Sequence, residues 1–224
     1  MRLEIGDQSP ISNLHMSINE FLSCLENTPP PPHCFNPYNH HTAANRTRRQ
    51  NLICYLRRMQ QLHPTILLVG EAPGYRGCRL TGVPFTSQTI LQEGIAPFLL
   101  FGANNGYQTT TEWPHIQREA TSTIMWQAIS TLIHPPLLWN ATPFHPHQPG
   151  NPQSNRTPTI SELDQGRPFL THLLHNFNIN RIIAVGNKAD QALTRQKIPH
   201  SKIRHPSHGG KQAFIQGLIE ACQK

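Results

Sequence analysis

The stretch Ile66-Leu67-Leu68-Val69-Gly70-Glu71-Ala72-Pro73-Gly74 decides the fold of this 224-residue chain. Its first four residues are apolar without alternation, which is typical of a short strand buried on both faces. Gly70 and the turn-forming residues after it predict that the strand ends there and that a shaped loop follows. A strand of this kind belongs in a parallel sheet, so further strands and covering helices are expected downstream.

Three later segments have the same form. They are Leu137-Leu138-Trp139 before Asn140, Ile182-Ile183-Ala184-Val185 before Gly186, and the more polar Lys202-Ile203-Arg204 before His205. Helices are expected between them at 88–102, 117–133, 160–177 and 187–196, with a last helix at 209–222. Strands that alternate with helices predict an α/β fold, in which helices cover both sides of a parallel sheet.

The residues before the first strand form a helical region. Apolar residues at helical spacing predict a helix over 13–27, and the run Pro29 to Pro32 ends it in a stiff, extended connector. A second helix is expected over 42–62, and its arginines form either a solvated face or a face that follows phosphates: Arg46, Arg48, Arg49, Arg57 and Arg58. No repeat or second domain is evident. We therefore treat 1–224 as a single domain, with 1–62 as a helical N-terminal extension packed on it.

Composition limits the class of protein. No run of 18 apolar residues occurs and the N-terminus lacks an apolar signal segment, so we expect a cytoplasmic protein without a membrane span, monomeric by default. The formal net charge of +7 fits a polyanionic partner, although charge for solubility explains it equally well. The five cysteines include no CxxC pair. We expect ordinary thiols, and no metal ion or iron–sulfur cofactor.

Three distinctive loops follow predicted strands, at residues 70–85, 140–156 and 205–211. Ligands of such sheets bind outside the carboxyl ends of the strands, so these loops are expected to converge on one site. The first loop has neither P-loop spacing nor the glycine pattern of dinucleotide-binding proteins. Within it, Phe85 is either a core residue beneath the loop or a stacking surface for a planar ligand. His205 makes local contacts, or it donates a hydrogen bond to developing negative charge.

Four elements together resemble the uracil-DNA glycosylase superfamily: Gly70-Glu71-Ala72-Pro73-Gly74, Gly82-Val83-Pro84-Phe85, Asn140 at a strand end, and His205-Pro206-Ser207. The first is similar to a motif of the thermophile-type family 4 enzymes, and its continuation through Phe85-Thr86 also resembles the family 5 loop. The resemblance covers residues 65–220. It implies a three-layer α/β/α sandwich around a central four-stranded parallel sheet. It also implies metal-free hydrolysis of the N-glycosidic bond of uracil, or a related deaminated base, in DNA.

The resemblance further implies roles for individual residues. The base must leave the helical stack to be reached. Phe85 would stack on it, Asn140 would pair with the O4 and N3–H edge of uracil, and His205 would hydrogen-bond O2 as the bond breaks. Substrate contacts are also expected from Gly70, Ala72 and Tyr75.

The group that positions the attacking water is left open by the resemblance. Many members carry an aspartate at the position of Ala72, and alanine cannot act as a base. We expect Glu71 to be the catalytic carboxylate that works with His205. The alternatives are that its side chain braces the loop, or that a backbone carbonyl of the loop holds the water.

The chain departs from the family pattern at the DNA surface. The loop after Ser207 lacks a bulky apolar wedge, which favours single-stranded or mismatched DNA as substrate. Gly74 stands where common uracil enzymes have a tyrosine that excludes thymine, and the adjacent Tyr75 is the nearest substitute. DNA contacts are expected from five residues: Ser87, Arg204, Ser207, His208 and Lys211.

Two rival functions remain open. The chain is a non-catalytic protein that binds uracil or single-stranded DNA, or it is a hydrolase of free nucleosides or nucleotides. The basic residues over 46–58 argue mildly against a small substrate, since such a substrate needs no extended positive surface.

Overall fold

The four apolar segments align as one parallel sheet in the computed structural model, which describes residues 17–223. The strands are β2 (Ile66–Gly70), β3 (Leu137–Asn140), β5 (Arg181–Val185) and β6 (Ser201–Ile203), and their order across the sheet is β3-β2-β5-β6. The register places Gly70 beside Asn140 and Val185 beside Ile203, so the strands end at one edge. The predicted α/β fold with a four-stranded parallel sheet is confirmed.

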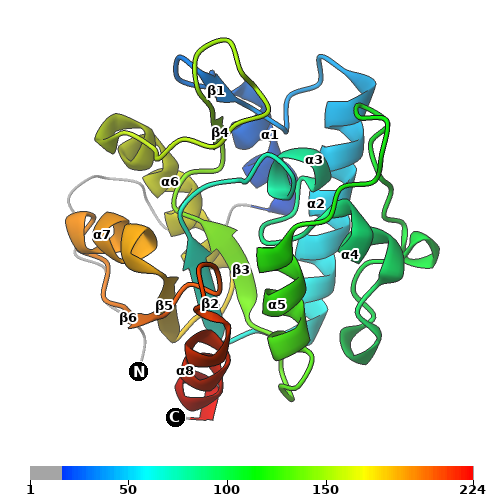
Figure 1. Cartoon of the computed structure of the whole chain (residues 1–224). Helices are drawn as coiled ribbons and strands as arrows, with labels where there is room; N and C mark the ends of the chain where they lie inside the picture. Colours follow the sequence, from blue (N-terminus) through cyan, green and yellow to red (C-terminus); the bar gives the residue numbers. More distant parts are fainter. Residues whose placement is uncertain (1–16, 224) are drawn as a thin grey trace.

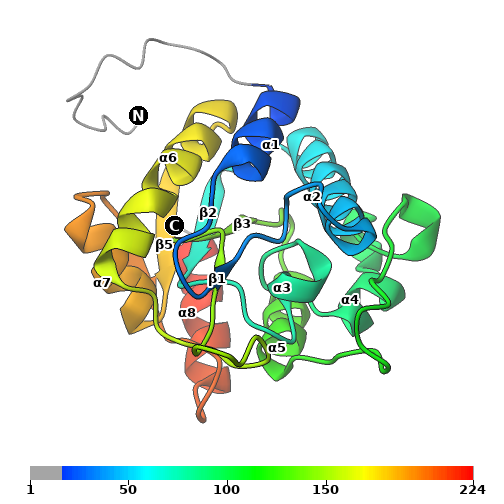
Figure 2. The same ribbon diagram turned by 90° about the horizontal axis from the view of Figure 1, so that it is seen from above.

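Helices cover both faces of this sheet (Figures 1 and 2). One layer holds α5 (Ala120–Ile129) and α8 (Lys211–Gln223), and the other holds α1 (Ile18–Asn27), α6 (Ile160–Asn176) and α7 (Asn187–Arg195). Helix α2 (Ala43–Leu62) runs beside the edge strand β3. There the Tyr55 hydroxyl accepts a hydrogen bond from the Leu138 N–H at 2.8 Å, which satisfies a donor on the side of β3 that pairs with no other strand.

The N-terminal helices share the core of the sheet domain. Helix α1 begins with a capping box, in which the side chains of Ser17 and Glu20 each accept a hydrogen bond from the other's backbone N–H. Its buried Phe21 lies 5.5 Å from Trp139 of β3 and 6.2 Å from Phe169 of α6, measured between ring centroids. Helix α1 is therefore packed against β3 and α6, whereas 1–16, including the start of the expected 13–27 helix, lie outside the described residues.

A small second sheet connects the N-terminal region to the loop after β3. Strand β1 (Cys34–Phe35) pairs antiparallel with β4 (His145–Pro146), so that Phe35 faces His145. The proline run thus leads through a turn into a strand, which holds the start of the 140–156 loop against the body of the protein.

The prediction of a single helix over 88–102 is wrong. Only α4 (Gln88–Glu93) forms there, because Gly94 takes a positive φ of 77° and Pro97 follows in a 3-10 turn, η1 (Ala96–Phe98). A second 3-10 turn, η2 (Ala103–Asn105), follows, and a short helix, α3 (Cys78–Thr81), lies inside the first loop. Glycine and proline outweigh the helical spacing of the apolar residues, since both disfavour a helix interior.

The prediction that Arg48 belongs to an exposed basic face of α2 is also wrong. Its side chain is buried, stacks on the Phe35 ring at 5.3 Å and is paired with Glu112. Burial lowers the pKa of Arg48 to about 10, although the Glu112 carboxylate opposes this shift. Arg58 is also engaged, since its Nε donates to the Phe98 carbonyl at 2.9 Å.

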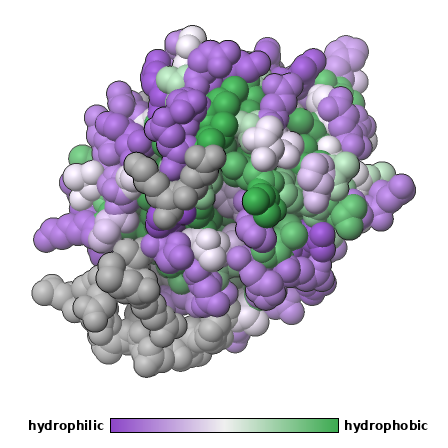
Figure 3. Space-filling model, turned by 90° about the horizontal axis from the view of Figure 1, so that it is seen from below, coloured by the Kyte–Doolittle hydropathy of each residue, from purple (hydrophilic) through white to green (hydrophobic). Residues whose placement is uncertain are grey.

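The surface at the amino ends of the strands is polar with an apolar area near its middle (Figure 3). Ile133, in the loop between α5 and β3, is 88% exposed. Among residues 17–223, none of the helices combines the length and the apolar character that crossing a bilayer requires.

Candidate active site

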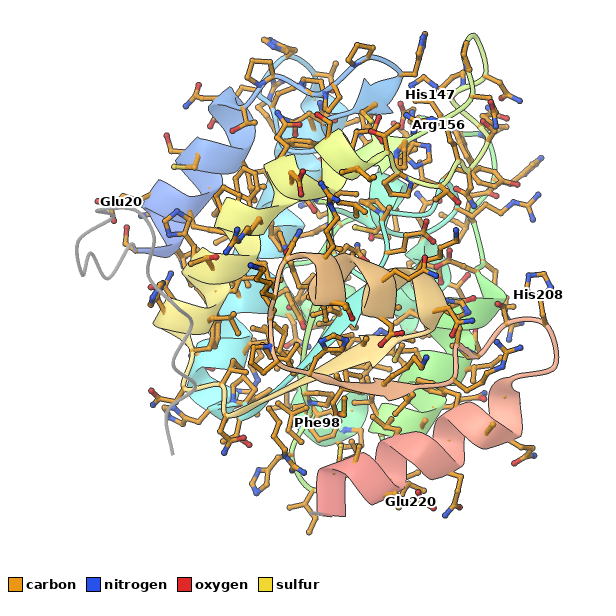
Figure 4. The ribbon with its side chains drawn as sticks, turned by 90° about the vertical axis from the view of Figure 1, so that its left-hand side faces the viewer. Glu20, Phe98, His147, Arg156, His208 and Glu220 are labelled. Atoms are coloured by element: carbon orange, nitrogen blue, oxygen red, sulfur yellow. The ribbon has the colours of Figure 1, made fainter. Side chains whose placement is uncertain are left out.

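The three loops meet at one cavity at the carboxyl edge of the sheet. The cavity has a volume of ≈ 380 Å³, and residues from all three loops line it: Glu71, Ala72, Phe85, Asn140, Asn155, Arg156, His205, Ser207 and His208. Figure 4 shows the labelled His147, Arg156 and His208 on the same side of the molecule, with Glu20 of α1 at the opposite side. The convergence expected from the order of the strands is therefore present.

Gly70 makes room for two of these side chains. A Cβ atom on Gly70 would lie 2.7 Å from Asn140 Oδ1 and 3.0 Å from Phe85 Cε2, which is too close for real atoms. Any larger residue at the end of β2 would displace the ring or the amide. The bare backbone of Gly70 therefore brings an aromatic ring and an amide to the same place.

Phe85 is held in a strained backbone conformation. Its φ is 53°, in the left-handed region that non-glycine residues rarely adopt. The buried Trp126 of α5 fixes this turn, because its Nε1–H donates to the Phe85 carbonyl at 3.1 Å. Phe85 is 9% exposed and lines the cavity, so it is part of the core and also borders the open space.

The contacts of His205 favour one tautomer of its neutral imidazole. Its Nδ1 accepts a hydrogen bond from the Ser207 N–H at 3.2 Å and lies 2.7 Å from the Ser207 hydroxyl. Burial lowers the pKa of His205, and the charges of Arg204 and His208 lower it further. Since Nδ1 is an acceptor, the proton of the neutral ring lies on Nε2, which is left as a hydrogen-bond donor.

Glycine also permits the position of His205. Gly186 ends β5 with a positive φ of 86°, and a Cβ there would lie 2.9 Å from the His205 Cβ. The close approach of these two loops is what brings the imidazole to the sheet edge.

Glu71 is a half-buried carboxyl that directly follows β2 and lines the cavity. Its Oε1 is buried without a hydrogen-bond partner. Burial raises the pKa of Glu71, and this shift is opposed by the charge of Lys188 and by the hydroxyl of Thr157. A carboxyl of this kind retains the capacity to accept a hydrogen bond from a ligand or a water.

Backbone hydrogen bonds join the first and second loops. The Gly70 carbonyl accepts from Ala141 N–H at 2.8 Å and the Glu71 carbonyl accepts from Thr142 N–H at 3.2 Å. Pro73 O lies 2.7 Å from Nδ1 of the buried His145. Within the described chain, no hydrogen bond reaches the carbonyl of Ala72, so Ala72 offers an open acceptor beside Glu71.

Five predicted site residues do not line the cavity: Gly70, Tyr75, Ser87, Arg204 and Lys211. Tyr75 packs its ring 5.9 Å from that of Trp113 and carries the Arg76 guanidinium over it at 5.2 Å. Its backbone N–H, not its ring, reaches the second loop, at Asn155 Oδ1. Ser87 is completely buried at the start of α4, which argues against the expected contact with a phosphate.

The remaining DNA-contact predictions fall at the rim. Ser207 and His208 line the cavity, whereas Arg204 and Lys211 are exposed in the same loop without lining it. His208 has a positive φ of 51° and precedes Gly209 at 74°; both residues are exposed, and this turn carries no apolar side chain. The loop thus offers polar and basic groups at the entrance.

Sequence reasoning missed the second carboxyl of the cavity, Glu119. It precedes α5, lines the cavity, and accepts a hydrogen bond from the Ser122 hydroxyl at 2.5 Å. Burial raises its pKa, and the bond from Ser122 opposes the shift. The only signal in the sequence is the pair Gly74 and Gly77, whose missing side chains make room for it.

The sequence analysis also missed Arg156, a cavity residue whose guanidinium is fixed by an ion pair. Its two terminal nitrogens donate to the Glu162 carboxylate at 2.9 and 2.8 Å. Burial of Glu162 acts to raise its pKa. The Arg156 guanidinium and neighbouring donors outweigh this effect and lower the pKa of Glu162 to about 2. Among residues 17–223, no three His, Cys, Asp or Glu side chains are grouped to hold a metal ion.

Comparisons with known proteins agree with this architecture. A family model described as the uracil DNA glycosylase superfamily matches residues 58–217, which is more than half of the chain. The crystal structure of wild-type SMUG2 from Pedobacter heparinus is similar, with a TM-score of 0.61 and 15% identity over 92% of this chain and 96% of that chain. That likeness concerns the fold. No curated protein matches the chain. The family match, over the segment that carries the four motifs, confirms the resemblance, and the chain belongs to the uracil-DNA glycosylase superfamily.

Proposed function

We propose that the protein is a monofunctional DNA glycosylase that hydrolyses the N-glycosidic bond of uracil, or of a related deaminated base, in base excision repair. The observation that carries the proposal is that Phe85, Asn140 and His205, remote in sequence, line a single cavity. An aromatic face, an amide and an imidazole donor are the groups that an extruded pyrimidine needs for stacking, for recognition of its edge and for charge stabilisation.

Asn140 supports selection of uracil over cytosine. A side-chain amide donates from its nitrogen and accepts at its oxygen, which matches the O4 acceptor and the N3–H donor of uracil. Cytosine presents the opposite pattern at this edge and leaves buried polar groups unpaired, at a cost of about 1–3 kcal/mol each. The buried position of Asn140 makes this mismatch effective, because water cannot replace the missing partner.

His205 supports stabilisation of the leaving base. Its neutral Nε2–H would donate to O2 of uracil, where negative charge gathers as the bond to C1′ breaks. A single donor of this kind is typically worth roughly 3–4 kcal/mol in the transition state. The hydrogen bond from Ser207 N–H fixes the ring without adding positive charge.

A water molecule must then attack the oxocarbenium-like C1′ and lose its proton. Glu71 is the carboxylate that we propose to accept that proton, since its Oε1 has no protein partner. The Ala72 carbonyl is the alternative holder of the water. Hydrolysis then yields free base and an abasic site, with no covalent enzyme intermediate.

The rim supports single-stranded or mismatched DNA as the substrate. Arg204 and Lys211 are exposed beside the cavity, where they would contact phosphates, whereas His208-Gly209-Gly210 offers no wedge to fill the gap in a duplex. We propose that the protein acts as a monomer in the cytoplasm.

The test is release of free uracil from a single-stranded oligonucleotide. We expect the unaltered protein to release uracil, and expect His205→Ala and Asn140→Ala to lose about 100-fold or more of the rate. His175→Ala, an exposed histidine on α6, is the matched control and should retain the rate.

A second candidate function is binding without cleavage. It is favoured by Ala72, which removes the carboxylate that many family members place there. Tight binding of uracil-containing DNA by the unaltered protein, with no abasic product from any deaminated base, would support this second function over the first.

A further inference from the structure

Glu119 occupies a position in the cavity that the proposed mechanism does not use. It comes from the residue just before α5, far in sequence from the three loops, and its carboxyl lies against the first loop. A Cβ on Gly74 would lie 2.6 Å from Glu119 Oε1, and a Cβ on Gly77 would lie 3.1 Å from the same atom. The carboxyl therefore fills the space that side chains of the loop would otherwise take.

The two oxygens of Glu119 are not equivalent. Ser122, which is buried in the first turn of α5, donates its hydroxyl to Oε2 at 2.5 Å. The Glu119 carbonyl accepts from Thr123 N–H at 3.1 Å, which fixes the backbone. In the described chain no side chain or backbone donor reaches Oε1, so this oxygen is the part of Glu119 that is free to meet a ligand.

The other cavity groups determine which edge of a pyrimidine remains for Glu119. In the proposed complex Phe85 covers a face of the ring, His205 meets O2, and Asn140 meets N3–H and O4. Around the ring the next atoms are C5 and C6. Glu119 is hydrogen-bonded to neither Asn140 nor His205, and it contacts the glycines of the first loop instead.

We propose that Glu119 is a specificity-determining residue, whose carboxyl faces the C5 edge of the flipped pyrimidine and disfavours the 5-methyl group of thymine. This inference rests on the proposed function, because it assumes the same base in the same cavity. The physical reason is that a methyl group placed on Oε1 would exclude water from this cavity-lining oxygen and give it no hydrogen bond in return. Gly74 offers no side chain that could do this.

The test compares release of uracil and of thymine from single-stranded oligonucleotides that differ only in the 5-methyl group. The proteins are the unaltered chain, Glu119→Ala, Glu119→Gln and the control Glu220→Ala, whose exposed carboxylate lies on α8 (Figure 4). The thymine-to-uracil rate ratio is expected to rise about tenfold or more in Glu119→Ala, the typical effect of removing an unpaired polar group. Glu119→Gln, which keeps the size and polarity, should stay near the unaltered ratio, and Glu220→Ala within about twofold of it.

Binding of the free bases gives a second readout that needs no cleavage. Calorimetry of free uracil and free thymine with the same proteins should show the ratio of the two dissociation constants moving in the same direction. If Glu119→Ala does not fold, Glu119→Asp, which withdraws the carboxyl by one methylene, takes its place.

The possible failures are distinguishable. A thymine-to-uracil ratio that Glu119→Ala leaves unchanged, in release and in binding, overturns the role of Glu119 and leaves the glycosylase proposal intact. Absence of release of uracil and of every other deaminated base from the unaltered protein overturns the glycosylase proposal, and the ratio of dissociation constants then decides the role of Glu119. Absence of base release together with lack of binding of either base overturns both.

Discussion

Asn140 Oδ1 lies 2.7 Å from the point that a Cβ of Gly70 would occupy, although 70 residues separate the two along the chain. The parallel register of β2 and β3 is the cause, since it sets Gly70 directly beside Asn140 at the carboxyl edge. The same missing Cβ admits the ring of Phe85. Three motif residues are thereby coupled, and several predictions depend on that coupling.

The first prediction concerns Gly70→Ala. The added methyl must push aside the Phe85 ring or the Asn140 amide, so we expect a loss of roughly 100-fold in uracil release, as for other misplacements of about 1 Å. Overpacking should also lower the free energy of unfolding by about 1–3 kcal/mol. Release assays and urea denaturation measure the two effects. Retention of the full rate would show that the close approach is unimportant.

The second prediction concerns Glu71. If it accepts the proton of the attacking water, Glu71→Gln should lower the rate by about 100-fold or more at neutral pH. Burial raises the pKa of Glu71, so the acid limb of the pH–rate profile should lie above the ordinary range of a glutamate and should disappear in the variant. A nearly unchanged rate in Glu71→Gln would instead assign the water to the Ala72 carbonyl.

The third prediction concerns stability at acid pH. Burial lowers the pKa of His145 to about 4 from its ordinary 6.5, although the bond to the Pro73 carbonyl opposes the shift. The folded pKa lies below the unfolded one, so this contribution is fully present above pH 6.5 and is lost as the pH falls toward 4. At about 1.4 kcal/mol per pKa unit, the loss amounts to about 2–3 kcal/mol.

Urea denaturation of the unaltered protein and of His145→Gln checks this prediction. Between about pH 7.5 and pH 4.5 the unaltered protein should lose more of its unfolding free energy than the variant does. Other histidines with lowered pKa values, such as His205 and His172, cancel in the comparison. Equal losses in the two proteins would mean that His145 is not buried as a neutral group.

The fourth prediction concerns the basic rim. Lys211→Ala and Arg204→Ala should each weaken binding to single-stranded DNA and reduce the slope of log K against log salt by about one. Arg195→Ala, an exposed arginine at the far end of α7 that is paired with Asp164, is the control and should leave the slope unchanged. Unaltered slopes in both rim variants would place the phosphates elsewhere.

Much of this architecture could be predicted from the sequence. Apolar runs before Gly70, Asn140 and Gly186, and a more polar run before His205, identified the strands. The loops that follow these strands then placed Phe85, Asn140 and His205 at one edge, because parallel strands end together. The prediction of a helix over 88–102 failed because the helical spacing of apolar residues continues across Gly94 and Pro97, and these two residues end the helix.

Other features could not be predicted because they depend on packing between distant segments. Nothing local to Glu119 shows that Gly74 and Gly77 will receive its carboxyl, and the exposed-looking Arg48 is buried only because Phe35 and Glu112 meet it. Charge along a helix cannot by itself distinguish an exposed arginine from a paired, buried one. Ser87 illustrates the converse, since a DNA contact was expected there but the residue is buried at the start of α4.

The most direct measurement of the central claim is a crystal structure of the protein with free uracil bound. Uracil is predicted to lie against the ring of Phe85, with N3–H and O4 within hydrogen-bond distance of the Asn140 amide and O2 within reach of His205 Nε2. Uracil found outside this cavity, or within it but away from any of these three side chains, would contradict the account.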